Sequence, residues 1–200
     1  KLFTPQSSLH VFQKQIIVDK LGVEVHNSHE RDAVAAAKKA LEKREDLIFV
    51  MAGSGDMQHR MMHYAAQLGI SDKLLFAGFL RREKVKEMYV MADVFVAPSV
   101  SEPFGLTILE AMNYNVPVIV SKNAGVSEII RNCLKVDFWD AHEIANKILA
   151  LLNYTSLNTC LRENAYQEIK KITWDTPAKK VISIYQNLMR REAQKREEKW

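Results

Sequence analysis

Short apolar runs alternate with amphipathic stretches along most of the chain. Within the stretches, apolar residues recur every three or four positions, which is the spacing of a helix with one buried face. The runs themselves are too short for buried helices and are typical of buried strands. We therefore predict strands over residues 47–51, 74–77, 94–97 and 118–120, and helices over residues 34–41, 59–68, 85–92 and 106–112.

One strand-plus-helix unit recurs about every 20–25 residues, which indicates an α/β fold with a doubly wound parallel sheet, Rossmann-like in its layout. Strand signals stop at Ala141, and extra C-terminal helices are expected near residues 144–152, 157–169 and 177–188. We divide the chain into a divergent N-terminal segment that holds a candidate first strand, one Rossmann-like domain and a charged tail. These parts cover residues 1–32, 33–190 and 191–200.

Composition narrows the classes of partner. The chain is 48% apolar and 26% charged, as in ordinary globular proteins, and its net charge of +4 is too small to indicate nucleic acid. No apolar run approaches the roughly 20 residues of a membrane span.

The first residues lack both Met and an apolar signal core, so we expect an excised fragment. Cys133 and Cys160 lack metal-type spacing, which favours free thiols and a cytoplasmic protein.

The segment after the third of these strands carries the most informative chemistry. An apolar strand at residues 94–97 leads into a turn with Glu102, Pro103, Phe104 and Gly105, and a helix follows. The first amides of a helix have no partner within the helix, so such a turn presents N–H groups to a phosphate. Glu110, further along the helix, has a carboxylate suited to a pair of sugar hydroxyls. A helix start with one ordinary surface glutamate and a second, solvated glutamate is the alternative interpretation.

Two more loops follow strands and are predicted to converge on this turn. Gly53, Ser54 and Gly55 follow the strand at residues 47–51, and Phe79 with Leu80 follows the strand at residues 74–77. Open parallel sheets bind ligands at the carboxyl ends of their strands, so these loops predict a nucleotide-type ligand. Gln58 replaces the third glycine of a dinucleotide fingerprint, which disfavours a nicotinamide dehydrogenase.

Two other features leave alternatives open. Gly125, Ser127 and Glu128 form either a further N–H cluster at the same edge or a plain helix start. His59 and His63 are four residues apart on a predicted helix, but they have no acidic or cysteine partner nearby. We therefore predict no metal site and no cofactor.

Residues 99–112 (SVSEPFGLTILEAM) resemble the signature of retaining glycosyltransferases of the glycogen synthase and sucrose synthase type, which belong to family 4 and have the GT-B fold. Other segments resemble the strands and loops of the same family, in the same order, over about residues 33–190. They are residues 49–55 (FVMAGSG), 75–80 (LFAGFL), 91–99 (MADVFVAPS), 116–121 (VPVIVS) and 125–130 (GVSEII).

The resemblance implies a role for each matching residue. The backbone of Phe79 and Leu80 would hold the base of a nucleotide-sugar donor, and Glu110 would hold its ribose. The amides of Gly105, Leu106 and Thr107 would meet the distal phosphate and the donor sugar, and Glu102 would lie near the reacting sugar. The loops with Gly53, Gly55 and Phe104 complete the expected donor site.

The chain departs from the family in three places. Residues 20–32 lack the family's Gly-Arg and Lys-Gly pairs, which hold the diphosphate, and Asn113, Tyr114 and Asn115 replace small residues and a glycine. The N-terminal domain that binds the saccharide acceptor is missing, so the chain resembles the C-terminal, donor-binding half alone. The exposed half-cleft would favour self-association. A non-catalytic nucleotide-binding or interaction module is the alternative function.

Overall fold

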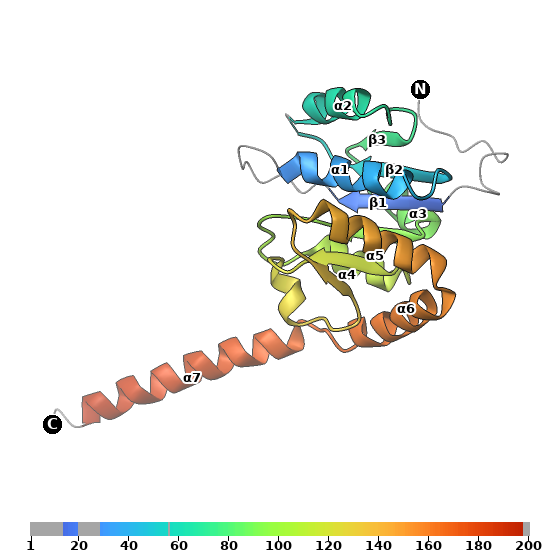
Figure 1. Cartoon of the computed structure of the whole chain (residues 1–200). Helices are drawn as coiled ribbons and strands as arrows, with labels where there is room; N and C mark the ends of the chain where they lie inside the picture. Colours follow the sequence, from blue (N-terminus) through green and yellow to red (C-terminus); the bar gives the residue numbers. More distant parts are fainter. Residues whose placement is uncertain (1–13, 20–28, 56, 198–200) are drawn as a thin grey trace. The chain divides into compact units, whose positions relative to one another are not determined.

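The computed structural model describes residues 14–19, 29–55 and 57–197. All six strands form one parallel sheet in the order β3-β2-β1-β4-β5-β6, which confirms the doubly wound fold (Figure 1). The strands are β1 (Lys14–Asp19), β2 (Leu47–Ala52), β3 (Leu74–Gly78), β4 (Val94–Ala97), β5 (Val118–Ser121) and β6 (Leu134–Val136).

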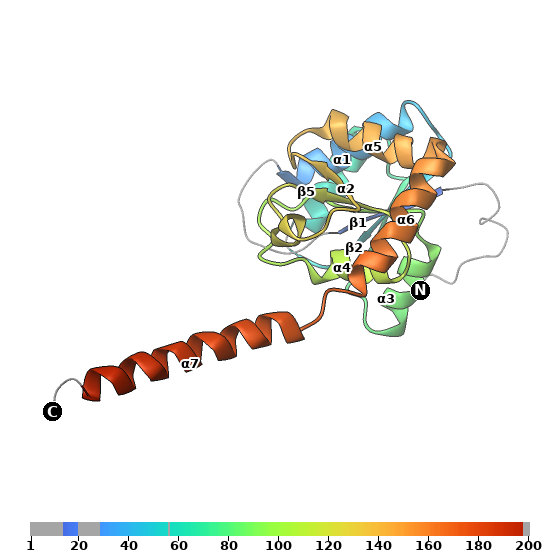
Figure 2. The ribbon, with the colours of Figure 1, turned by 90° about the horizontal axis from the view of Figure 1, so that it is seen from below.

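Helices connect these strands and cover both faces of the sheet. Figure 2 shows α1 and α5 on one side of the strands and α3 and α4 on the other. The helices are α1 (His29–Leu41), α2 (Gln58–Gln67), α3 (Glu83–Met91), α4 (Leu106–Asn113), α5 (Ala141–Asn153), α6 (Thr155–Ile169) and α7 (Asp175–Glu197), with a 3-10 helix, η1 (Gly125–Glu128).

Strands β4 and β5 are buried on both faces, and the side chains of β4 alternate between two apolar layers. Val94 and Val96 of β4 pack with α1, α2 and α5, whereas Phe95 faces the other side, where Ile108 and Met112 of α4 are buried. Burial on both faces explains why β4 is apolar throughout and β5 is apolar up to Ser121, instead of alternating with polar residues. This packing fixes the point from which the loop after β4 departs.

Within the described residues, the elements up to Ile169 form one compact unit, and the residues from Lys170 onward form a second. The second unit contains α7, a single helix of 23 residues with basic and acidic residues along its last turns. None of the described helices combines the length and the apolar character that a membrane span requires.

The order of the strands determines where a ligand can bind. From β1 the chain runs outward through β2 and β3, then returns to place β4 on the other side of β1. At such a reversal of strand order, open parallel sheets bind ligands in the crevice at the carboxyl ends of the strands, here β1 and β4. The loop after β4 is described, whereas residues 20–28 after β1 lie outside the described residues.

Candidate functional site

The turn between β4 and α4 contains a glycine that no other residue replaces without strain. Gly105 is the N-cap of α4 with φ 101° and ψ 54°, in the left-handed region that favours glycine. A Cβ atom added there would lie 2.9 Å from Cδ1 of Ile108 and 3.0 Å from Cγ1 of Val126. The site therefore needs glycine both for its backbone angle and for space.

The start of α4 leaves hydrogen-bond donors available. No side chain of the described residues caps this helix, and the amides of Gly105 and Leu106 have no acceptor among those residues. Unpaired amides and the positive end of the helix dipole together attract an anion. The predicted phosphate-binding residues thus lie at a helix start that can bind a phosphate.

The second N–H cluster, one of two interpretations for the loop at Gly125, is wrong. The amide of Gly125 donates to the carbonyl of Glu102 at 2.8 Å, and that of Val126 donates to the carbonyl of Phe104 at 2.7 Å. The amide of Ser127 donates to Ala124 at 2.8 Å. The first two of these donors support the β4–α4 turn, and none of the three is available to a ligand.

Gly125 also allows its own loop to approach the β4–α4 turn closely. A Cβ atom on Gly125 would lie 2.1 Å from the carbonyl oxygen of Pro103, far inside any van der Waals contact. Its hydrogen bond to Glu102 forms beside an isolated parallel bridge between Glu102 and Ala124. The shape of the phosphate-binding turn therefore depends on a glycine outside it.

The two glutamates differ in their surroundings. Glu102 is half-buried, and its Oε1 accepts a hydrogen bond from the amide of Phe104 at 3.2 Å, within the same turn. Glu110 is exposed on α4, with its Oε2 3.3 Å from the hydroxyl of Tyr89 on α3. Both carboxylates therefore keep capacity for further donors, since each offers two oxygens. The sequence predicts only that Tyr89 lies in the helix over residues 85–92, and not that it contacts Glu110.

The loops after β2 and β3 lie at the same edge of the sheet, and they are bonded to each other. The amide of Gly53, at φ 124°, donates to the carbonyl of Gly78 at 2.8 Å, and Gly55 accepts from the amide of Gln58. Gly53 therefore holds the two loops together and has no free amide for a ligand. Leu80 is half-buried beside them.

Large apolar side chains are exposed around the start of α4 and in the loop after β3. Phe79 is 67% exposed, with the guanidinium of Arg81 5.5 Å from the centre of its ring. Leu106 is 57% exposed and Phe104 is 37% exposed. Apolar groups exposed beside free amides suit a ligand that has both a flat apolar part and a phosphate.

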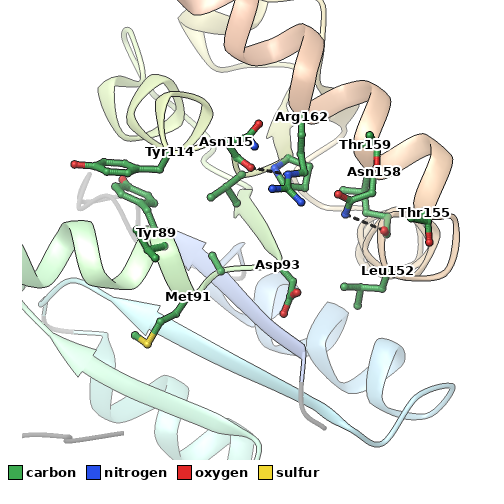
Figure 3. Close-up of a pocket in the computed structure, with 15 residues that line it drawn as sticks. Tyr89, Met91, Asp93, Tyr114, Asn115, Leu152, Thr155, Asn158, Thr159 and Arg162 are labelled. Carbon is green, nitrogen blue, oxygen red and sulfur yellow. Dashed lines mark hydrogen bonds between the residues drawn. The ribbon is translucent and has the colours of Figure 1, made fainter. Parts of the chain in front are cut away.

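A cavity of about 400 Å³ lies at the opposite, amino-terminal ends of β4 and β5 (Figure 3). Two of its polar side chains bond to backbone carbonyls that line it: Nε of Arg162 donates to the carbonyl of Asn115 at 2.8 Å, and Nδ2 of Asn158 donates to that of Leu151 at 3.1 Å. Asn115 has φ 60°, a region that asparagine tolerates, which explains how it replaces the family's glycine. The cavity contains none of the predicted donor-site residues.

Two other chemistries find little support in the described residues. Burial raises the pKa of the Cys133 thiol to about 11, so this cysteine is a poor nucleophile at neutral pH. No group of three or more His, Cys, Asp or Glu side chains in the described part could hold a metal ion. His63 instead pairs with Gln67 on the same helix.

Comparisons with known proteins agree with this architecture. The family model "Glycosyl transferases group 1" matches residues 11–168. An uncharacterized glycosyltransferase of Methanocaldococcus jannaschii, MJ1607, is 36% identical over 160 residues, which are 78% of this chain and 41% of that protein. The chain spans about two fifths of the length of the first curated relatives it matches.

Solved structures share the fold. The C-terminal domain of a group 1 glycosyl transferase (LpcC) from Francisella tularensis has a TM-score of 0.69 and 23% identity, and the match covers 84% of this chain and 94% of that one. Anabaena Alr3699/HepE, solved in complex with UDP and glucose, has a TM-score of 0.72 and 17% identity. The match covers 92% of this chain and 53% of that one. The chain therefore has the fold of a GT-B glycosyltransferase C-terminal domain.

Proposed function

Because this chain belongs to the glycosyl transferases group 1 family, we propose that it is the donor-binding half of a retaining glycosyltransferase, of the family 4 type. The observation that carries this proposal is the start of α4. The amides of Gly105 and Leu106 have no acceptor among the described residues, and they follow β4 at the crevice of the sheet. A nucleoside diphosphate sugar has the negative charge that such a helix start binds.

The predicted roles fit the geometry of the turn. In this proposal the diphosphate lies against the amides of Gly105, Leu106 and Thr107, and Glu110 binds the ribose hydroxyls. The base lies at the loop of Phe79 and Leu80, where an exposed aromatic ring is available. Phe104 then covers one side of the ligand, and its exposure leaves room for that contact.

Catalysis requires stabilisation of the diphosphate as it departs. Negative charge builds up on that group while the bond to the anomeric carbon breaks, so fixed N–H dipoles stabilise the transition state more than the ground state. Glu102 lies at the mouth of the same turn, near the expected position of the reacting sugar. No metal or cofactor is part of the proposal.

The acceptor, a saccharide in this proposal, binds a domain outside this chain. The chain covers about two fifths of the first curated relatives it matches, and in this proposal donor and acceptor bind between two domains. Positioning of two reactants supplies about 7–11 kcal/mol of a reaction barrier, so the 200-residue chain alone should transfer no sugar. Its open half-cleft would favour self-association. Its free cysteines, Cys133 and Cys160, are compatible with the proposed cytoplasmic location.

Calorimetric titration with nucleoside diphosphates and their sugar conjugates tests the donor site. We expect weak binding that Glu110→Ala reduces by about 1.5–3 kcal/mol, the contribution of hydrogen bonds to a charged group. Equal affinity of the wild type and the variant would remove Glu110 from the ribose site. Binding by this chain, with no transfer by the protein that includes the acceptor domain, would favour the non-catalytic module.

A separate experiment tests the stereochemistry. The protein that includes the acceptor domain would be incubated with the donor that binds, and NMR would record the anomeric configuration of the product. Retention of the donor's configuration is the expected result. Inversion would contradict the family 4 assignment and leave the donor site in place.

A further inference from the structure

Tyr89 lies in the last turn of α3 with its ring held on two sides. The side chain is only 4% exposed. Its ring contacts Phe95 of β4 edge to face, with centroids 5.6 Å apart, and stacks on Tyr114 after α4 at 5.5 Å and 16°. Figure 3 shows the two tyrosines together beside the cavity. Packing from a strand and from the end of α4 leaves this ring one orientation.

The hydroxyl of the fixed ring points between two acceptors on α4. It lies 3.1 Å from the carbonyl oxygen of Thr107 and 3.3 Å from Oε2 of Glu110. A tyrosine hydroxyl has one proton to donate, and the charged carboxylate is the stronger of the two acceptors. The contact thus connects a buried, immobile donor to the exposed carboxylate that we assign to the ribose.

We propose that Tyr89 is a positioning residue for ribose recognition, an inference that rests on the proposed function. Glu110 is exposed, and without a partner its long side chain would sample several rotamers. A donor fixed in the core selects the rotamer in which Oε2 faces Tyr89. One carboxylate has acceptor sites for more donors, so both ribose hydroxyls can still bind. Tyr89 therefore raises nucleotide affinity without touching the nucleotide.

A double-mutant cycle on the whole chain tests this role by calorimetry. The proteins are the wild type, Tyr89→Phe, Glu110→Ala and the double variant. The probes are UDP and ADP, which carry the same ribose, and pyrophosphate, which carries none. Tyr154→Phe is a matched control, because Tyr154 is 66% exposed between α5 and α6. Tyr89→Phe keeps the ring and its packing, so its melting temperature should fall by no more than the few degrees that one hydrogen bond contributes.

We expect Tyr89→Phe to weaken binding of UDP or ADP about three- to tenfold, the effect of one net hydrogen bond. Its affinity for pyrophosphate should not change, and it should add no loss to the Glu110→Ala variant. The same loss for pyrophosphate, or in the Glu110→Ala background, would show a structural role and overturn the proposal.

Two further outcomes separate this inference from the function on which it rests. A wild type that binds UDP or ADP, together with a Tyr89→Phe variant of equal affinity, would overturn the positioning role alone. A wild type that binds neither nucleotide would overturn the donor site and this inference with it.

Discussion

Two helices of this protein, α4 and α5, begin in different ways. At the start of α5, Oδ1 of Asp140 accepts a hydrogen bond from the amide of Glu143 at 2.8 Å, so the protein satisfies that donor itself. At the start of α4, Gly105 has no side chain to do this, and no other described side chain caps the helix. The first start has a side-chain cap within the chain, whereas the second has none and keeps donors for a ligand.

The positions of the two helices in the fold explain the difference. α5 follows β6 at the edge of the sheet, whereas α4 follows β4, next to β1 at the crevice. The starts of α2 and α3, after β2 and β3, also lack a side-chain cap among the described residues. A missing side-chain cap therefore does not mark a ligand site by itself, and α4 is distinguished by its place beside β1, where the sheet topology predicts a ligand.

The cavity at the other end of β4 extends the comparison. It is hollow, but the hydrogen bonds of Arg162 and Asn158 are made to protein carbonyls. The α4 start has amides without a described acceptor and exposed apolar groups beside them. For anion binding, the donors that remain unpaired are more informative than the volume of a hollow.

The largest effect is expected for Gly125→Ala. The new methyl group would overlap the carbonyl of Pro103, a backbone atom that moves only with the whole turn. We expect the free energy of unfolding to fall by about 3 kcal/mol, and nucleotide binding to be lost as the turn shifts. Urea unfolding measures the first effect and calorimetry the second. Gly69→Ala, at a glycine with open space around it, is the control, and an unfolding midpoint equal to the control's would contradict the expected overlap.

Gly105→Ala should have the next largest effect. Alanine would be strained at φ 101° and would crowd Ile108 and Val126, so we expect a loss of about 2 kcal/mol in unfolding free energy. Affinity for a nucleoside diphosphate should fall as well, because the amide of residue 105 would move. Gly69→Ala again serves as the control, since Gly69 also has a positive φ, 70°, but open surroundings. Its replacement should lower the free energy of unfolding by about 1 kcal/mol. A variant with wild-type melting temperature and affinity would place the phosphate elsewhere.

The smallest effect is expected for Asp140→Ala. Loss of this cap should lower the free energy of unfolding by about 1 kcal/mol, because the amide of Glu143 loses its acceptor. Asp140→Ser should restore most of the loss, since serine is also a good cap. Nucleotide affinity should stay the same in both variants. A fall in affinity would mean that the two helix starts are not independent.

The sequence predicts the strands well because they are short apolar runs. Residues 94–97 form β4 with the predicted bounds, and β2, β3 and β5 each end one residue later than predicted. β6 was not predicted, since three residues with Lys135 in the middle carry little signal and its pairing with β5 is long-range. The local pattern of apolar residues therefore predicts where strands lie better than it predicts which strands pair with each other.

In the candidate site, too, the local features can be predicted from the sequence and the long-range contacts cannot. The glycine turn and the glutamates can be predicted from residues that are adjacent in the sequence. The support from Gly125 and the contact from Tyr89 join segments about twenty residues apart, and only the folded chain brings them together. For Gly125 the sequence left two interpretations, because an amide's partner is not visible in the residues beside it.

The most direct test of the account is an amide NMR titration of the chain with UDP. We expect the largest shifts at the amides of Gly105 and Leu106, and no shift at the amide of Glu143 at the start of α5. Shifts concentrated at the capped start of α5 or around Arg162 in the cavity, with Gly105 and Leu106 unchanged, would contradict the assignment of the α4 start as the phosphate site.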